Sequence, residues 1–182
     1  MAASVVRRLA QIDEPTLHGL AALLVDAVDG GASVSFMAPL SHERALTFWR
    51  RIAADVARGE RALLVAEDAQ GIVGTVHLVL GQPENQPHRA DLSKLLVHRR
   101  ARQQGLGEVL MRAAEAMGRE EGKTLLVLDT ASDAAERLYT RLGWQRCGVI
   151  PGYALLPQGG LCDTVLFYRV LGPDGADGTS GS

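Results

Sequence analysis

The sequence has 182 residues, a formal net charge of -2 at pH 7, a pI of about 6.2, and 47% hydrophobic against 22% charged residues. This composition excludes an intrinsically disordered chain, and the length is typical of one domain with one hydrophobic core. The near-neutral charge excludes a global positive field that would attract nucleic acid or anionic membranes, so any phosphate site must be local.

Cysteine content and hydropathy narrow the class of protein further. Cys147 and Cys162 are the two cysteines, without a CxxC pair or a neighbouring histidine cluster, so we expect no disulfide framework and no metal site. No apolar run approaches the roughly 18 residues of a membrane span, and the opening MAASVVRRLA lacks the apolar core of a signal peptide. We therefore expect a cytoplasmic monomer or homodimer with no nucleic-acid or membrane partner.

Two helices are predicted after a short apolar opening over 5–9. The first begins near Pro15, a residue favoured in a first turn, and its apolar residues recur at three- and four-residue steps until Gly30. The segment 30–40 is too irregular for a helix or a strand. A second amphipathic helix begins at Ser41.

Three strands are predicted next. Residues 61–67 and 72–80 are rich in Val, Leu and Ile, and the turn residues 68–71 between them indicate an antiparallel hairpin. A polar loop over 81–88 then leads to a third strand that ends at 95–97.

The second half of the chain alternates strands with helices. An amphipathic helix over about 105–122 precedes an apolar strand over 124–128, which we expect to be covered on both faces. Ser132 is the expected N-cap of a further helix that ends at Gly143.

Two final strands are expected over 144–149 and 163–170, and the loop between them contains Pro151–Tyr153. The whole order of elements predicts an α/β (α+β) fold, a mixed sheet with helices on both faces, in a single domain over 1–171. The tail 172–182 is polar and has no large apolar residue to bury, so we expect it to be disordered.

The segment between the third strand and the next helix has the features of a phosphate-binding turn. The first turn of a helix exposes unpaired N–H groups with a partial positive charge, and Gly105 and Gly107 remove Cβ atoms that would keep a diphosphate away. Arg99, Arg100 and Arg102 can meet the remaining negative charge. Glycines that begin a helix for packing and arginines on a solvated turn are the alternative. The spacing matches neither a Rossmann fingerprint nor a P-loop.

Two segments together resemble the signatures of the GNAT superfamily of N-acetyltransferases. Arg102–Gly107 resembles the R/Q-x-x-G-x-G/A signature, and Leu95–Val97 resembles the strand that precedes it. Ser132–Trp144 is similar to the N-x-x-A-x-x-x-Y-x-x-x-GF segment of the superfamily. Two motifs in the right order are more specific than either alone, and the resemblance covers about residues 5–171.

This resemblance implies a GNAT-like central sheet of about six to seven mostly antiparallel strands, with acetyl-CoA as co-substrate. Ser132 stands where the superfamily often has Asn, and Trp144 replaces the usual Phe and keeps a buried aromatic residue. The residues implied to bind coenzyme A are Leu95, Leu96, Val97, Arg102, Gln103, Gln104, Gly105, Leu106, Gly107 and Ser132.

Within the superfamily, four shorter segments resemble the tabtoxin-resistance acetyltransferases, which modify a small amino-acid-like toxin. These segments are GGASVSFMAPL, LDT, PGY and FYRVLG. The resemblance implies a small-molecule amine as acceptor and a role in detoxification or antibiotic resistance.

The implied reaction is the attack of an uncharged amine on the acetyl thioester, with the thiolate of coenzyme A as leaving group. It requires a hydrogen-bond donor for the oxyanion, which the resemblance assigns to a main-chain N–H on Leu95–Val97. The resemblance also places Tyr139 beside the sulfur, where a phenol can protonate the thiolate. Tyr139 lies on the apolar stripe of its helix as well, so a packed core residue is the alternative.

Asp129 is the candidate base or anchor for the amine. It follows an apolar strand at its carboxyl end, the edge at which ligands of open α/β sheets usually lie. A partly desolvated carboxylate there can accept a proton, and a solvated one can hold the ammonium. A helix-capping Asp before Ser132 is the alternative.

The acceptor side is expected to involve loop residues. The loop between the first two helices can cover the cleft with Ser33, Ser35, Phe36 and Met37, and Tyr153 can close the other side. His77 and Asp91 are further candidates on predicted strands, although a lone histidine in a strand is more often structural.

Three functions are therefore consistent with the sequence. The first is an enzyme that acetylates a small amine, and the second is a protein or peptide N-acetyltransferase. The third is a coenzyme A-binding module without turnover, which would not need Asp129 or Tyr139. Both residues are present, so we favour an enzyme.

Overall fold

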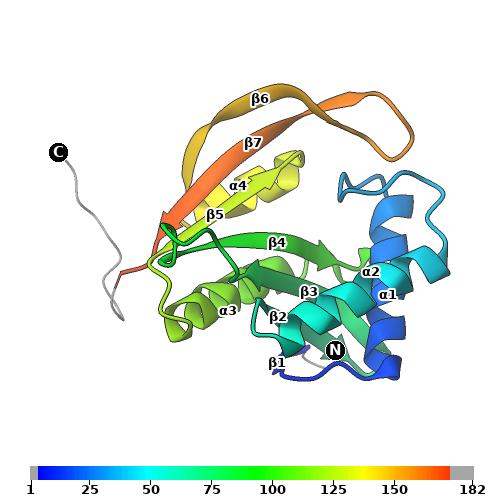
Figure 1. Ribbon diagram of the computed structural model, residues 1–182. Coiled ribbons are helices and arrows are strands. Elements are labelled where there is room, and N and C mark those ends of the chain that lie inside the picture. Colours follow the sequence, from blue (N-terminus) through cyan, green and yellow to red (C-terminus); the bar gives the residue numbers. More distant parts are fainter. Residues whose placement is uncertain (1–3, 173–182) are drawn as a thin grey trace.

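The computed structural model describes residues 4–172, which form one seven-stranded sheet in the order β1-β2-β3-β4-β5-β7-β6 (Figure 1). All neighbouring strands are antiparallel except β4 and β5, so the expected mixed, mostly antiparallel sheet is confirmed. The predicted polar tail lies outside the described residues, apart from Gly172. The strands are β1 (Val5–Leu9), β2 (Arg61–Asp68), β3 (Gly71–Val79), β4 (Arg89–Val97), β5 (Leu125–Thr130), β6 (Gln145–Leu155) and β7 (Leu161–Val170).

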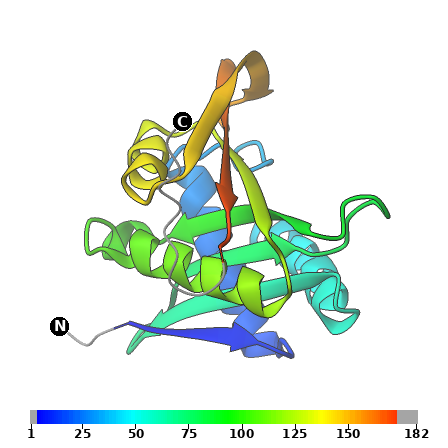
Figure 2. The same cartoon turned by 90° about the vertical axis from the view of Figure 1, so that its left-hand side faces the viewer.

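Helices cover both faces of the sheet, as the pattern predicted (Figure 2). The helices α1 (Glu14–Asp29) and α2 (His42–Ala57) pack on one face, and α3 (Leu106–Glu120) packs on the other. The alternation of β2 explains the two cores: Leu63 and Val65 join the core under α1 and α2, while Leu64 joins the core under α3. No helix within residues 4–172 is long and apolar enough to cross a membrane.

The predicted helix starts are confirmed by their caps. Asp13 and Ser41 cap α1 and α2, because each side chain accepts a hydrogen bond from the backbone N–H three residues later. The last helix, α4 (Asp133–Arg141), is capped in the same way by Ser132.

The sheet opens between β4 and β5. The two strands run parallel and pair only where Arg89–Asp91 meet Leu125–Val127, and beyond this point they diverge (Figure 1). One extra residue also bulges from β4: Thr75 pairs with Leu96 and His77 with Ser93, so three steps on β4 face two steps on β3. The gap in pairing creates room at the carboxyl ends of β4 and β5.

Two local expectations differ from the structure. The strand β5 was expected to be covered on both faces, but only Leu126 and Leu128, on one face, are buried. The helices α1 and α2 lie over β2, β3 and β4, so they leave the other face of β5 open. The segment Pro151–Tyr153 was expected in a loop, but it belongs to β6, which accommodates it through an irregularity in its pairing with β7. The β6–β7 hairpin extends as a long arm that rises away from the rest of the sheet (Figure 1).

Candidate active site

A cleft of about 1110 Å³ lies where β4 and β5 separate. Its lining comes from β4, the start of α3, the end of β5, α4, the β6–β7 hairpin and the loop between α1 and α2. Pockets for small molecules usually have volumes up to about 1,000 Å³, and this cleft exceeds that range. It therefore has room for a long ligand and a second molecule beside it.

The start of α3 can hold a phosphate group. Gly105 precedes the helix with φ +79°, and no side chain caps its first turn, so these backbone N–H groups remain available to a ligand. A Cβ placed on Gly105 would meet nothing within 4 Å, because it would point into open space. A Cβ on Gly107 would lie 3.1 Å from Leu138, so packing against α4 also requires a small residue there.

The bulged part of β4 forms one wall of the cleft. Lys94, Leu95 and Val97 line it, and Lys94 adopts φ +54° within the bulge. Leu96 also borders the cleft, but its side chain is 4% exposed and packs into the core under α1 and α2. A bulge removes backbone groups from the regular ladder, so the main chain here can donate to a ligand in the cleft.

Tyr139 and Asp129 both line the cleft. Tyr139 is 5% exposed and contacts the rings of Trp144 and Phe167. It is therefore both a packed core residue and part of the cleft lining. Burial, and next the charge of Asp129, raise the pKa of the Tyr139 phenol well above its ordinary value, so it stays protonated at neutral pH. It is therefore a possible proton donor.

Asp129 accepts a hydrogen bond from the Thr164 hydroxyl at 2.8 Å. The residue that caps α4 is Ser132, so the structure does not use Asp129 as a helix cap. Its side chain is exposed toward the cleft from the end of β5. This position lets the carboxylate meet an amine that enters the cleft.

Residues 32–144 match the family model described as the Acetyltransferase (GNAT) family. The chain belongs to this family. It is thus an N-acetyltransferase that uses acetyl-CoA.

Solved structures share the fold of this acetyltransferase over nearly its whole length. A ribosomal-protein-alanine N-acetyltransferase from Brucella melitensis is 24% identical, covers 92% of this chain and 99% of its own, and gives a TM-score of 0.78. A putative acetyltransferase from Salmonella typhimurium, solved with its cofactor acetyl-CoA, is 18% identical. It covers 98% of this chain and 100% of its own, with a TM-score of 0.77. A phosphinothricin acetyltransferase from Sinorhizobium meliloti in complex with acetyl-CoA is 18% identical. It covers 98% of this chain and 94% of its own, also with a TM-score of 0.77.

The three arginines expected near the phosphates of acetyl-CoA have different roles in the acetyltransferase. Arg99 donates from its backbone N–H and its Nε to Asp26, and Arg100 forms an ion pair with Asp68. Only Arg102 lines the cleft, with its Nε 3.1 Å from the carbonyl oxygen of Val97. Arg99 and Arg100 therefore anchor the turn to α1 and β2, and Arg102 remains as the candidate phosphate ligand.

Two residues expected to bind coenzyme A have side chains that form hydrogen bonds within the protein. Gln104 does not line the cleft, because its side-chain amide turns back to donate to the carbonyl of Arg100 at 3.2 Å. Ser132 borders the cleft, but its hydroxyl oxygen accepts from the N–H of Ala135 at 3.3 Å and so caps α4. Gln103, Gly105, Leu106 and Gly107 border the cleft as expected.

His77 was expected on the acceptor side, but the structure places it in the core. It is 1% exposed, packs edge-on against Trp49, and its Nε2 lies 3.2 Å from an Arg61 nitrogen. Burial, and next the charges of Arg61 and Lys94, lower the pKa of His77 well below its ordinary value, so it is neutral. Asp91 is also outside the cleft lining, since its carboxylate binds Gln82 and Arg89.

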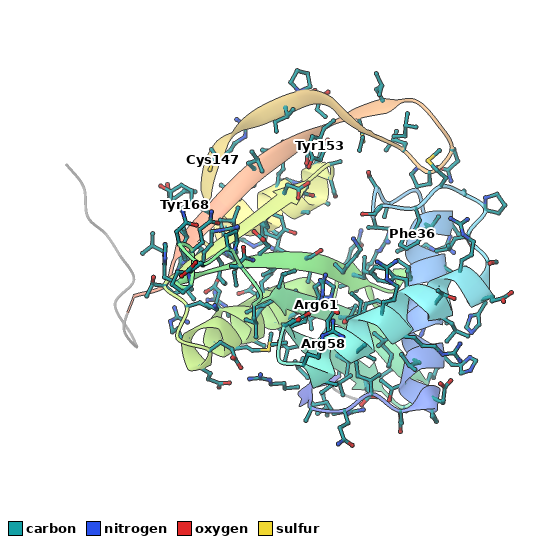
Figure 3. The ribbon with its side chains drawn as sticks, in the orientation of Figure 1. Phe36, Arg58, Arg61, Cys147, Tyr153 and Tyr168 are labelled. Carbon is teal, nitrogen blue, oxygen red and sulfur yellow. The ribbon has the colours of Figure 1, made fainter. Side chains whose placement is uncertain are left out.

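The other acceptor-side residues border the cleft from two directions. Ser33, Ser35, Phe36 and Met37 do so from the loop between α1 and α2, and Tyr153 does so from β6. Figure 3 shows Phe36 on this loop and Tyr153 on the hairpin arm.

Two residues that the sequence interpretation missed lie in this cleft, Lys94 and Thr164. A signal for Lys94 existed, because it is the one cation within the mostly apolar run 92–97. No local pattern marks Thr164, whose partner Asp129 is 35 residues away in sequence.

Proposed function

We propose that this acetyltransferase transfers the acetyl group to the amine of a small molecule. The observation that carries this proposal is the closure of the cleft on the acceptor side. The N–H of Ala38, in the loop between α1 and α2, donates to the carbonyl of Pro157, in the β6–β7 hairpin, at 2.9 Å. Ser33 reinforces the contact: its hydroxyl lies 3.5 Å from the carbonyl oxygen of Leu155 and 3.7 Å from the Cys162 sulfur.

These contacts tie the loop to the hairpin arm, and both border the same cleft. A peptide acceptor needs an opening through which its chain can leave the cleft, on one side of an N-terminal amine or on both sides of a lysine residue. A loop joined to a hairpin across the cleft restricts such a path, whereas a compact acceptor can be enclosed. The geometry therefore favours a small amine over a protein substrate.

Each wall of the cleft has a role in this proposal. Acetyl-CoA supplies the thioester carbonyl that the acceptor amine attacks. The uncapped first turn of α3 and the Arg102 side chain bind its diphosphate, and the main chain of Leu95–Val97 donates to the carbonyl oxygen. Tyr139, held protonated by burial, donates a proton toward the sulfur. Asp129 accepts the proton of the amine or holds the ammonium before attack.

The chemical class of the acceptor is further supported by the segments that resemble the tabtoxin-resistance acetyltransferases. Several of their residues, including Ser33, Ser35 and Tyr153, border the acceptor side of this cleft. An amino-acid-like toxin or antibiotic is the acceptor that we propose, with detoxification as the role.

The test is to incubate the purified protein with acetyl-CoA and to follow the release of free thiol. Two sets of acceptors are compared: small amines, including amino acids and amino-acid-like antimetabolites, and peptides with free N-termini or lysines. We expect turnover with at least one small amine and none with peptides. A higher kcat/KM for peptides contradicts the proposal, and acetyl-CoA binding without turnover on any acceptor indicates a binding module instead.

A further inference from the structure

We infer that Lys94 binds an anionic group of the acceptor, a carboxylate in the simplest case, and so determines which amines the enzyme accepts. This inference rests on the proposed function, because it concerns the acceptor side of the same cleft. It requires an acceptor that carries both an amine and an anion.

The position of Lys94 is unusual for a lysine. It is one of two lysines in a sequence in which the other 17 of 19 basic residues are arginines. It lies in the bulge of β4 at φ +54°, a backbone conformation that non-glycine residues rarely adopt, and it borders the cleft. Regular strand geometry would point alternate side chains to opposite faces, and the bulge is what redirects this one.

The Lys94 ammonium contacts two groups that carry no charge. Its Nζ donates to the Ser35 hydroxyl at 3.2 Å and lies 5.8 Å from the centre of the Phe48 ring. Among residues 4–172, no carboxylate forms an ion pair with it. Nearby Arg61, in contrast, has its own partner in Asp55 at 2.8 Å.

A partly buried cation without a counter-ion is unfavourable, and the lowered pKa of Lys94 reflects this. Burial lowers the pKa of Lys94, the charge of Asp129 acts in the opposite direction, and the charge of Arg61 lowers it further. An anion bound beside Nζ would supply the missing partner and favour the charged form. The site is therefore built to gain from an anionic ligand.

The opposite charge lies on a different strand of the same cleft. Asp129, at the end of β5, can attract the ammonium of an acceptor, while Lys94 on β4 attracts its anion. Both groups line the same cleft, and the charge of Asp129 raises the pKa of Lys94, so an acceptor that carries both charges can be placed between them. The other cations of the lining, Arg102 and Arg141, belong to the turn before α3 and to α4.

One of the neutral neighbours of Lys94 comes from the loop that closes the cleft. Ser35 belongs to the loop between α1 and α2, which is tied to the hairpin arm through Ala38 and Pro157. An anion held by Lys94 would thus be enclosed by the loop that covers the acceptor. A neutral amine of similar size would leave the ammonium without its partner, and such mismatches support strong discrimination.

The first experiment measures selectivity. Each L-α-amino acid that is acetylated is compared with its amide and with its decarboxylated amine, and kcat/KM is determined for each. For the wild-type protein we expect the carboxylate form to be preferred. In Lys94→Met the ratio of kcat/KM for acid over amide should fall at least tenfold, mainly through a higher KM for the acid. Comparing ratios between variants cancels the different amine pKa values of the acceptors.

Two further variants make this result specific. Lys94→Arg keeps the cation and should retain part of the preference. Lys123→Met removes the other lysine, whose Nζ donates to the backbone carbonyls of Leu80 and Pro87, and should leave the ratio unchanged. A ratio that is the same in Lys94→Met and the wild-type protein overturns the inference, even if acetylation itself is observed.

The second experiment does not require turnover. The wild-type protein with bound coenzyme A is treated with a lysine-selective acylating reagent, and modification is followed by mass spectrometry of peptides. Free amines consume the reagent, so the rate of Lys94 modification is divided by that of Lys123 in the same sample. Within a panel of L-α-amino acids, those that bind should lower this ratio, and the matching amides should not. Equal protection by acids and amides, or none by either, contradicts the inference. Because binding is read directly, this outcome remains distinct from a failure of the proposed acetylation.

Discussion

The hydroxyl of Thr164 donates a 2.8 Å hydrogen bond to the carboxylate of Asp129 and so links β7 to β5 at the cleft. Thr164 is 2% exposed and also reaches the carbonyl of Thr130 at 3.3 Å, so its position is well determined by packing. A hydrogen bond to a carboxylate fixes which oxygen faces the ligand. The Thr164 hydroxyl therefore orients the Asp129 carboxylate where it borders the cleft.

Replacing Asp129 by Asn should lower kcat/KM for the acceptor by roughly 10²–10⁴-fold, the range typical for loss of a general acid or base. The variant Thr164→Val keeps the shape but removes the donor, and it should give a smaller loss in the same direction. Thiol release measures both. Asp133→Asn, an exposed acid in the first turn of α4, is the matched control. If Asp129→Asn keeps full turnover, Asp129 is neither base nor anchor.

Tyr139→Phe should lower kcat by roughly 10²–10⁴-fold with little change in the KM for acetyl-CoA, since it removes only the proton donor. Tyr168→Phe, which changes a tyrosine on the outer part of β7, is the control and should behave as the wild-type protein (Figure 3). Loss of acetyl-CoA binding in Tyr139→Phe would instead show that this ring acts through packing.

The pH dependence of the reaction provides an independent check on Tyr139. Burial and the charge of Asp129 raise the pKa of this phenol above its ordinary value of 10, so the protonated form persists as the pH rises to 10 and beyond. We therefore expect no loss of kcat from this residue between pH 7 and 10. A decrease of kcat in that interval that disappears in Tyr139→Phe would contradict the assigned environment.

The phosphate site can be tested with two glycines that share one backbone conformation. Gly105 and Gly122 have φ of +79° and +69°, and a Cβ on either would meet nothing within 4 Å. Alanine at either position should cost about 1–2 kcal/mol of stability from the left-handed backbone. Only Gly105→Ala should also raise the Kd for acetyl-CoA, as measured by calorimetry, because Gly122 lies at the other end of α3. Equal affinities in both variants would exclude α3 as the binding element.

A buried hydrogen bond holds α3 beside the start of β6. The indole N–H of Trp144 donates to Glu115 at 2.8 Å, and both residues are buried. Trp144→Phe should destabilise the fold through lost packing and by about 1–3 kcal/mol more for the carboxylate left without a partner, as measured by urea unfolding. Trp49→Phe is the control, because its N–H has no hydrogen-bond partner within residues 4–172. Adding Glu115→Leu to Trp144→Phe should recover part of the loss, and strict additivity would contradict this account.

The order of the elements could be predicted because its causes are local. Apolar residues at helical or strand spacing, Ser41 and Ser132 at helix starts, and glycine before α3 act within a few residues of chain. The same short range made the two family motifs readable. Tyr139 and Gly105 were found in this way, and the structure places both at the cleft.

The sequence-based expectations that the structure does not bear out share one cause, contacts between segments that are distant in sequence. Nothing near His77 in sequence shows that Trp49 and Arg61 will cover it, and nothing near Arg99 and Arg100 shows that Asp26 and Asp68 will pair with them. Burial and charge pairing depend on which strands become neighbours.

The sequence by itself determined the helices, most of the strands, the mixed fold and the glycine turn, since backbone preference and side-chain periodicity act over short stretches of chain. Only the tertiary structure decided that Thr164 orients Asp129, that Ala38 closes the cleft against Pro157, and that Lys94 forms no ion pair with a carboxylate among the described residues. Charge and solvation depend on distance in space, and residues far apart in sequence set that distance when the sheet assembles.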